Sequence, residues 1–350
     1  MSTRLTLVCA AKLHTNQLER HLELFEHVPE VERVIVVRHA PLSSRLGKVE
    51  NRIIDASSRL SLALGLVRKV RHIVHSEKVD LVIGFNPVPW GSLASLATSG
   101  SEVPVCLSLI GMDYLQIGRW WGYPFLRAVQ HAQSVTVTGQ RMARGLSELG
   151  VDAARVRILP HSVDISRFAP SAGTKDWDVV AIGQLVQRKR MDVLIDAVSL
   201  LAKRGRRIRV AILGKGPLES ELKDRARDLG VEGQVEFLGY RNDVEAVLAR
   251  ARTFCLASEW EGVPFALMEA MAAGVVPVVT DVGTISDWVR DGDNGLLIQP
   301  GSAASLAAAW EQLFDEGLLE SARQRLVAER DRLSLAHGAT VWRGILGLPD

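Results

Sequence analysis

The chain has 350 residues, of which 47% are hydrophobic and 23% are charged, and its formal net charge is +2. This length predicts about two domains, each large enough to bury a sizeable core. The three cysteines each stand singly in an apolar run, which excludes a disulfide framework and a cysteine-based metal site.

The expected compartment is the cytoplasm, because unpaired cysteines suit a reducing environment and the N-terminal stretch lacks the long apolar region of a signal peptide. No uncharged apolar run approaches the roughly 18 residues of a membrane span. Residues 1–170 hold 20 Lys and Arg against 14 Asp and Glu, which leaves 22 against 26 for the remainder. A basic first half predicts an anionic acceptor or a membrane surface as partner, and a solvated basic face is the equal alternative.

The first half of the chain alternates short β-branched runs with helical stretches. Strands are predicted at 4–9, 33–37, 80–85, 103–110, 134–138 and 156–159, and a helix at 140–149. Residues 45–78 carry eight Lys or Arg against three acids, interleaved with leucine, valine and isoleucine. This pattern predicts a basic amphipathic helix. It either packs on the domain surface, which is the favoured interpretation, or lies on anionic lipid, where each basic residue adds about 1 kcal/mol.

Residues 119–127, RWWGYPFLR, concentrate aromatic side chains between two arginines. Tryptophan and tyrosine suit water–apolar boundaries and arginine suits phosphate, so this segment is a candidate contact for an acceptor or a lipid headgroup. Ordinary packing of a loop explains it at least as well.

The second half alternates strand and helix with short connections, as a doubly wound parallel sheet requires. Strands are predicted at 177–183, 209–213, 235–239, 253–257, 275–280 and up to 298, and helices at 191–203, 264–273, 303–332 and 335–346. After the turn at 214–217, Glu219 stands where a dinucleotide loop needs glycine, so NAD is disfavoured. Asp291-Gly292-Asp293 matches a D-x-D metal pattern but is interpreted as a turn, and no metal is expected.

The most informative stretch is 258–283, SEWEGVPFALMEAMAAGVVPVVTDVG. Between Gly262 and Thr280 the single ionisable side chain is Glu269, which lies on a predicted helix that is apolar nearly all round and therefore buried. A buried carboxylate needs a partner, either an arginine of a neighbouring helix or the hydroxyl groups of a ligand. In the second case Glu261 and Glu269 flank a cleft, and the N–H groups of the helix start, near 263–266, bind an anion. Hydroxyls and phosphate together indicate a sugar nucleotide.

The spacing Glu261-x7-Glu269, in the setting EGVPFALMEAMAAGVVPVV, resembles the signature of the family-4 retaining glycosyltransferases, which have the GT-B fold. The segment PHSVDISRFAP at 160–170 is similar to the P-N-G-V-D-x-x-R-F sequence at which those enzymes cross between domains. A third segment, GQLVQRKR at 183–190, is similar to their Gly-Arg-Leu followed by Lys-Gly.

The resemblance implies an α/β chain of two Rossmann-like, doubly wound parallel-sheet domains that face a central cleft. It assigns residues 1–168 to acceptor binding, with a final helix at 333–350 packed back on them. It assigns residues 169–332 to binding of the nucleotide-sugar donor.

Roles for individual residues follow from the same resemblance. Glu261 would contact hydroxyls of the donor sugar, Glu269 those of the ribose, and Lys189 the diphosphate. Backbone N–H groups of 265–267 would also meet the diphosphate, and the base would sit against the backbone near Tyr240. The candidate catalytic residues are Glu261, Lys189 and Asp113, and the candidate donor-binding residues are Gly183, Gln184, Arg188, Gly214, Tyr240, Val263, Phe265, Ala266, Leu267 and Glu269.

Three departures from the family pattern bear on function. Ile110 stands where the resembling enzymes carry a histidine beside the reacting sugar, and isoleucine cannot transfer a proton. Gln184 replaces an arginine of the diphosphate site, a charge that Arg188 or Arg190 could restore. The loop after the first strand lacks the usual Gly-Gly pair.

The predicted reaction is transfer of a sugar from a UDP- or GDP-linked donor to an acceptor hydroxyl, with retention of anomeric configuration and without metal or cofactor. The acceptor would be a glycan, a lipid-linked molecule or a small molecule, and no nucleic acid is expected to bind. Two alternatives remain: a sugar-nucleotide epimerase or hydrolase on the same scaffold, and a catalytically silent scaffold or partner subunit, which Ile110 and Gln184 suggest.

Overall fold

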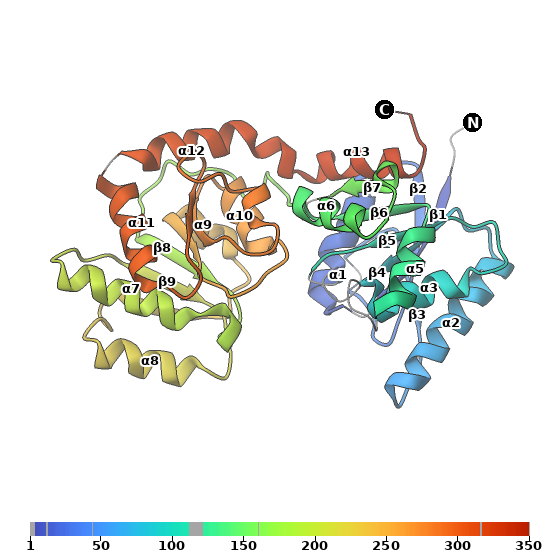
Figure 1. The fold of residues 1–350 in the computed structure, drawn as a ribbon, viewed down its shortest axis with the longest axis horizontal. Helices are drawn as coiled ribbons and strands as arrows, with labels where there is room; N and C mark the ends of the chain where they lie inside the picture. Colours follow the sequence, from blue (N-terminus) through green and yellow to red (C-terminus); the bar gives the residue numbers. More distant parts are fainter. Residues whose placement is uncertain are drawn as a thin grey trace. The chain divides into compact units, whose positions relative to one another are not determined.

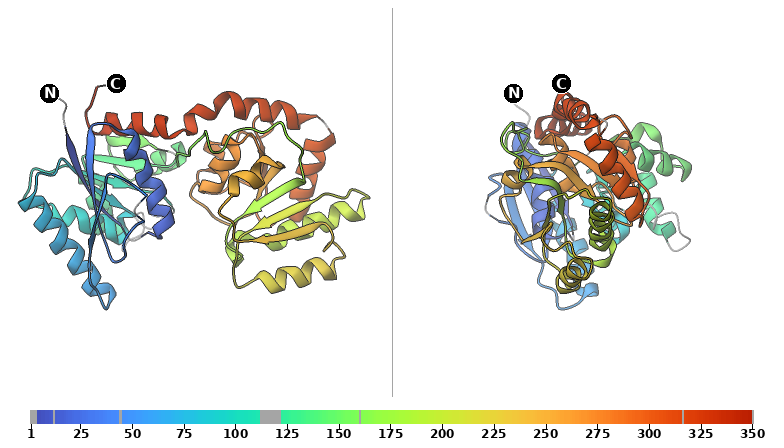
Figure 2. Two further views of the ribbon diagram at one scale, coloured as in Figure 1. Left: turned by 180° about the vertical axis from the view of Figure 1, so that it is seen from behind. Right: turned by 90° about the vertical axis from the view of Figure 1, so that its left-hand side faces the viewer.

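The computed structural model describes residues 4–11, 13–43, 45–111, 122–159, 161–315 and 317–349. The chain divides into two compact units, Met1–Ser162 with Leu335–Asp350, and Val163–Ser334. Each unit is a parallel sheet with helices on both faces (Figures 1 and 2). The prediction of two doubly wound parallel sheets is therefore confirmed.

The sheet of the first unit has seven strands in the order β3-β2-β1-β4-β5-β6-β7. Its central strands are apolar on both faces, as parallel strands covered by helices on both sides must be. The strands are β1 (Leu5–Ala10), β2 (Val31–Arg38), β3 (Val49–Ile53), β4 (Leu81–Phe85), β5 (Val105–Ser108), β6 (Ser134–Val137) and β7 (Val156–Ile158).

Two apolar clusters, one on each face, form the core of the first unit. On one face lie α1 (Thr15–Leu22), the 3-10 helix η1 (Glu23–His27) and α13 (Leu335–Ile345). Phe25 of η1 packs against Trp342 of α13, with 4.9 Å between the ring centroids, so the last helix belongs to this core. The other face carries α2 (Arg59–Ser76), α3 (Ser92–Ala97), α5 (Tyr123–His131) and α6 (Gln140–Glu148).

The basic stretch 45–78 contains a strand as well as a helix, which the prediction of a single amphipathic helix missed. Residues 49–53 form β3, which pairs in parallel with β2 at the edge of the sheet. Its sequence, VENRI, has no apolar run. The charged residues Glu50 and Arg52 are tolerated in the strand because they form ion pairs with Arg33 and Glu77. The helix α2 then begins at Arg59, capped by the Ser58 hydroxyl, which accepts from the Ser61 N–H.

The sheet of the second unit has six strands in the order β10-β9-β8-β11-β12-β13. Counted along the chain this is 3-2-1-4-5-6, in which the direction of strand addition reverses between β8 and β11. The strands are β8 (Trp177–Ile182), β9 (Val210–Leu213), β10 (Val235–Gly239), β11 (Ala251–Leu256), β12 (Val276–Thr280) and β13 (Leu296–Ile298).

Helices cover both faces of this second sheet (Figure 1). α7 (Met191–Lys203), α8 (Glu219–Asp228) and α11 (Ala303–Asp315) pack together, and α10 (Phe265–Ala272) packs with α12 (Leu318–Glu329) and β12. A sixth helix, α9 (Val244–Ala249), precedes β11. No helix in the described parts of the chain is both long and apolar enough to cross a bilayer.

Candidate functional site

The loops that follow β8 and β11 lie beside each other at the carboxyl edge of the second sheet. The two strands pair in parallel, from Ala251 opposite Trp177 to Cys255 opposite Ala181, so their carboxyl ends meet at one edge. The strand order reverses between these two strands. In open α/β sheets the point of reversal, at the carboxyl ends of the strands, is where ligands bind.

Three predicted residues come together at this edge. Lys189 Nζ donates a hydrogen bond to Glu261 Oε1, and Arg188 Nη1 lies 3.6 Å from the same oxygen. Lys189 and Glu261 are only 8% and 7% exposed, so this is a buried ion pair. Loss of either member of a buried pair strongly lowers the stability of the protein, because the remaining charge has no water to solvate it.

Glu259 and Arg190 also join the two loops. The Glu259 N–H donates to the Arg188 carbonyl at 2.9 Å, and Arg190 Nη1 donates to Glu259 Oε1 at 3.0 Å. Arg190 has φ +48°, a left-handed conformation that glycine adopts without cost and an L side chain adopts at about 1–2 kcal/mol. Ion pairs of Arg190 with Glu259 and Asp192 oppose that cost.

Gly183 and Gly214 allow close approach of backbone at the ends of β8 and β9. A Cβ on Gly214, whose φ is +139°, would lie 1.8 Å from the Gly183 carbonyl oxygen. A Cβ on Gly183 would lie 3.3 Å from Lys189 Cε, so the missing side chain leaves room for the lysine. Both glycines therefore shape the backbone around Lys189.

We expect Gly214→Ala to lower the stability of the protein by about 2–5 kcal/mol, from backbone strain together with the clash against Gly183. Gly230→Ala is a matched control, since Gly230 also has a left-handed φ of +67°, but a Cβ added there would meet nothing within 4 Å. Thermal and urea unfolding of both variants would measure the difference. Equal losses would contradict the claim that close packing at Gly214 matters.

Glu269 lies in the interior of α10 and is 3% exposed, as its apolar surroundings predict. Val263 is buried just before the helix, and Pro264 is the N-cap residue with extended backbone, which leaves Phe265 and Ala266 in the first turn. The Leu267 N–H donates to the Pro264 carbonyl at 3.0 Å. The backbone N–H groups of 265–267 are expected to bind a diphosphate. The N–H group of Leu267 already donates to an acceptor within the helix.

The remaining predicted residues do not contact the Lys189–Glu261 pair in any interaction described above, and one of them lies outside the described residues. Gln184 is exposed and uncharged, and Tyr240 is 60% exposed after β10. Since β9 and β8 separate β10 from β11, Tyr240 follows a strand that is three positions away in the sheet from the strand before the Glu261 loop. Ile110 is 8% exposed in the apolar core of the first unit. Asp113 lies outside the described residues.

Sequence reasoning missed three residues that hold the Glu261 loop. Trp260 lies under the Arg188 guanidinium, whose central carbon is 4.9 Å from the ring centroid. The buried Thr280 hydroxyl donates to the Ser258 carbonyl at 2.7 Å. Gly283 has φ +60°, and a Cβ there would lie 1.9 Å from the Glu261 carbonyl oxygen. Trp260 and Gly283 could have been found from the sequence, because both lie within the stretch 258–283 that carries the two glutamates.

The D-x-D segment forms a turn, as expected. The Gly292 N–H donates to the Gly295 carbonyl at 3.0 Å, and Asp291 Oδ1 accepts from the Leu297 N–H at 2.9 Å. Asp293 forms ion pairs with Arg290 and with an arginine of α12. Both carboxylates therefore stabilise the turn and the helix packed beside it.

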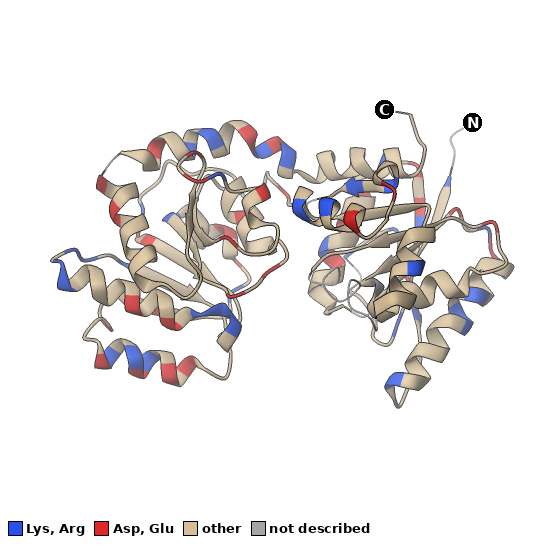
Figure 3. Cartoon of the chain, in the orientation of Figure 1, with Lys and Arg blue, Asp and Glu red and all other residues tan. Residues whose placement is uncertain are grey.

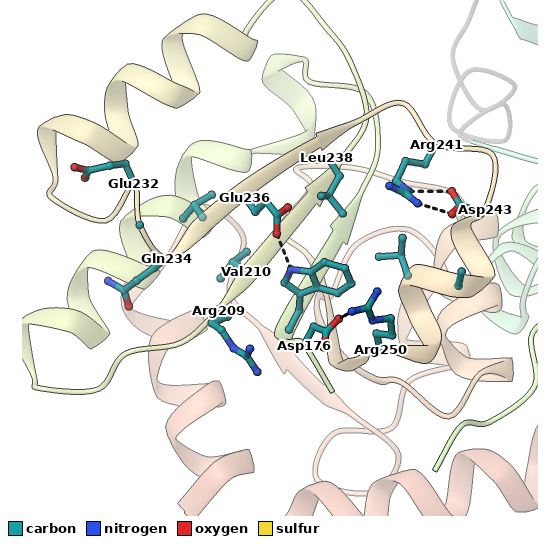
Figure 4. A pocket seen from close by; sticks show the side chains of 15 residues that line it. Asp176, Arg209, Val210, Glu232, Gln234, Glu236, Leu238, Arg241, Asp243 and Arg250 are labelled. Carbon is teal, nitrogen blue, oxygen red and sulfur yellow. Dashed lines mark hydrogen bonds and ion pairs between the residues drawn. The ribbon is translucent and has the colours of Figure 1, made fainter. Parts of the chain in front are cut away.

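A cavity of about 770 Å³ lies elsewhere in the second unit, between β10, β9 and α9 (Figure 4). Five of its charged side chains have partners within the lining: Arg241 pairs with Asp243, Arg250 pairs with Asp176, and Glu236 accepts a hydrogen bond from the Trp177 indole N–H. None of the residues predicted to bind a donor lines it. We therefore place the candidate site at the carboxyl edge of the sheet and not in this cavity.

Two Rossmann-like parallel sheets, with a lysine–glutamate pair at the point of strand reversal in the second, define a protein of the GT-B class. The structure of Anabaena HepE, solved in complex with UDP and glucose, matches 98% of this chain and 100% of its own, with a TM-score of 0.81 at 18% identity. A likeness at that identity concerns the fold alone.

The family is identified by sequence. The family model described as Glycosyl transferases group 1 matches residues 162–330, and the one described as Glycosyltransferase Family 4 matches residues 24–167. The chain belongs to the group 1 glycosyltransferases.

Two curated relatives show how far the likeness extends. The exopolysaccharide phosphotransferase SCO2592 of Streptomyces coelicolor is 33% identical over 248 residues, which are 69% of this chain and 26% of that protein. The lipopolysaccharide core biosynthesis glycosyltransferase LpsE of Rhizobium meliloti is 29% identical over 275 residues, 76% of this chain and 74% of that protein. The chain thus spans about a quarter of the first relative and three quarters of the second.

Proposed function

We propose that the chain transfers a sugar from a nucleoside-diphosphate sugar to an acceptor hydroxyl in polysaccharide or lipopolysaccharide biosynthesis, with retention of configuration and without metal. The observation that carries this proposal is the convergence of Lys189, Arg188 and Glu261 at the strand reversal of the second sheet. The family, and the names of the relatives, support it.

The departure of the nucleoside diphosphate explains why the proposed reaction needs basic residues at this site. As the glycosidic bond breaks, negative charge grows on the leaving diphosphate, and fixed donors aimed at that charge lower the barrier. An ammonium has three N–H donors, so Lys189 can keep its bond to Glu261 and still donate to phosphate oxygens. The start of α10 adds about 0.3–2 kcal/mol, against about 1.5–3 kcal/mol for each charge-assisted hydrogen bond. Lys189 is therefore expected to contribute more than the helix.

Glu261 and Glu269 supply acceptors for hydroxyl groups. An ionised carboxylate only accepts, so it suits the hydroxyl groups of a sugar or a ribose and repels phosphate. In the proposal Glu261 binds the donor sugar and Glu269 the ribose. The leaving phosphate itself accepts the proton of the acceptor, which removes the need for a histidine at the position of Ile110.

An anionic acceptor is supported by Arg38 in the first unit. Arg38 ends β2 at the carboxyl edge of its sheet and is 2% exposed. Its Nη2 donates to the Leu13 carbonyl at 2.9 Å, and Nε and Nη1 have no hydrogen-bond partner among the described residues. Burial lowers the pKa of Arg38, which is the cost of holding a guanidinium away from water. A phosphate or carboxylate group of the acceptor would satisfy those donors.

We expect Arg38→Met to raise the KM for the acceptor about 10- to 100-fold, the worth of one charge-assisted hydrogen bond, while the KM for the donor stays unchanged. Initial rates with each substrate varied in turn would separate the two constants. Thermal unfolding of the same variant would control for stability. An increase confined to the donor KM would overturn the assignment of Arg38 to the acceptor.

The first unit is also proposed to touch an anionic membrane, at its cytoplasmic face, through α2. One side of α2 packs in the core through five apolar residues, so it is a surface helix, as favoured. Its outer side exposes Leu60 and Leu64, at 70% and 49%, next to basic residues that Figure 3 shows along the helix. Exposed leucines beside Lys and Arg suit the boundary between lipid headgroups and acyl chains.

We expect the protein to sediment with vesicles that contain an anionic phospholipid and to be released by salt, because basic residues near such a surface contribute about 1 kcal/mol each. Leu60→Ser with Leu64→Ser should release most of the bound protein. Val327→Ser, at an exposed valine of α12 in the second unit, is the control. Equal binding to neutral vesicles, or no effect of the leucine changes, would rule out this contact.

The function is tested with a panel of UDP-, GDP- and ADP-sugars. A true donor present at 100 times its dissociation constant stabilises the protein by about 2.7 kcal/mol, which thermal unfolding detects. Product analysis with and without acceptor then identifies the reaction. A new glycoside with retained configuration supports transfer, whereas an epimer or free sugar indicates the enzymatic alternatives. Binding without turnover on any acceptor indicates a silent scaffold, and the absence of any binding refutes the proposal.

A further inference from the structure

The loop after β8 carries three consecutive basic residues, Arg188, Lys189 and Arg190, and no charge at Gln184. Gln184 is exposed and can offer only neutral hydrogen bonds to a diphosphate. A diphosphate leaving group carries more charge than one ammonium balances. If the site binds such a group, a second basic side chain has to serve it.

Arg190 is committed to other partners. Its guanidinium donates to Asp192 Oδ2 at 2.9 Å and to Glu259 Oε1 at 3.0 Å. These bonds also raise the pKa of Arg190, above all through Asp192. Because its backbone is held in the left-handed conformation, moving the side chain to a ligand would break the contacts that support that conformation.

Arg188 is held differently. Its guanidinium lies on the face of Trp260, 4.9 Å from the ring centroid, and its nearest acid oxygen, in Glu261, is 3.6 Å away, too far for a hydrogen bond. A guanidinium stacked on an aromatic ring keeps its N–H donors in its own plane, where they can meet a phosphate bidentately. The Arg188 side chain is 34% exposed, and Trp260 is 46% exposed, so a ligand can approach both.

We propose that Trp260 and Arg188 act as a pair that binds the diphosphate of the donor and supplies the charge absent at Gln184. Arg188 contacts the phosphate, and Trp260 is a positioning residue that keeps the guanidinium beside Glu261. This inference rests on the proposed function, since it names a partner for the leaving group of that reaction. It also gives a reason for an exposed tryptophan directly before Glu261.

Binding of UDP, GDP and ADP, and of UMP, GMP and AMP, measured by calorimetry, tests the pair. For the diphosphate that binds best, Arg188→Ala should weaken binding about 10- to 100-fold, the worth of one charge-assisted hydrogen bond, and should change binding of the monophosphate little. Trp260→Leu should weaken diphosphate binding about 2- to 5-fold, the worth of an exposed cation–π contact, and Trp260→Phe should retain most of it. Arg207→Ala, an exposed arginine before β9, is the control for the same change of net charge.

A rescue experiment separates a role in binding from a role in folding. Gln184→Arg added to Arg188→Ala should restore diphosphate binding and turnover, because it returns the charge from the position used by the resembling enzymes. Equal loss for mono- and diphosphates, or no rescue, would overturn the pairing while leaving the proposed function intact. If the unaltered protein binds no nucleoside diphosphate, the proposed function and this inference both fail.

Discussion

Lys189→Met is expected to lower the rate of sugar transfer about 100- to 1000-fold, comparable with the loss of a single preorganised donor at a site of developing charge. Methionine keeps an unbranched side chain that is one atom shorter than that of lysine and removes the ammonium, so the effect mainly reports the loss of the charge. Initial rates at saturating donor would measure it. Lys203→Met, at the exposed end of α7, is the control and should leave the rate unchanged.

The same substitution is expected to destabilise the protein, because it leaves Glu261 buried without its closest partner. Removing one member of a buried pair typically costs about 3–5 kcal/mol. Glu261→Gln in the same chain removes the orphaned charge, so the double variant should be more stable than Lys189→Met alone. Urea unfolding of the unaltered protein, the two single variants and the double variant gives the coupling free energy between the two side chains. If rate and stability recover together in the double variant, the lysine is structural and not a donor to the leaving group.

Glu269→Gln is expected to weaken nucleotide binding about 10- to 100-fold, because hydrogen bonds to a charged acceptor are stronger than those to an amide. The glutamine preserves the shape of a side chain that is only 3% exposed on α10, so the helix should remain packed. Calorimetry with the nucleoside diphosphate that binds best would measure the change. Glu221→Gln, at the start of α8, is a control outside the candidate site.

Deoxy analogues show whether the ribose is the group recognised. In the unaltered protein, removal of the 2′- or 3′-hydroxyl should lower the affinity for the nucleotide, since a hydrogen bond to the charged carboxylate is lost. In the Glu269→Gln variant, removal of the same hydroxyl should cause a smaller loss of nucleotide affinity. If the deoxy analogues lose equal affinity in both proteins, Glu269 does not bind the ribose and serves the packing of α10 instead.

Much of the fold could be predicted because its signals are local. The helix expected at 191–203 is α7 with the same bounds, and the strand expected at 235–239 is β10 with the same bounds. Pro264 and Gly274 bracket α10 as their backbone preferences require, with Gly274 at φ +68° after the helix. Apolar periodicity, proline and glycine act within a few residues, so they can be interpreted without knowing the tertiary structure.

The strand β3 shows where that method fails. Its residues VENRI carry charges at the edge of a sheet, and their partners Arg33 and Glu77 lie far from them in sequence. Arg190 is a second case: a left-handed arginine is unfavourable locally and is stabilised by Glu259, 69 residues away. Local propensity cannot report contacts of this kind, because their free energy arises only once the distant segment has folded.

The sequence by itself determined the fold class, the family resemblance and the residue types of the candidate site, including both glutamates and the lysine. Only the tertiary structure decided that Lys189 and Glu261, 72 residues apart, share a hydrogen bond, and that Arg188 lies on Trp260 while Arg190 is occupied elsewhere. The physical reason is the order of strands in the sheet. Pairing of β8 with β11 brings their following loops together, and that pairing depends on the packing of the whole unit and not on any short stretch of sequence.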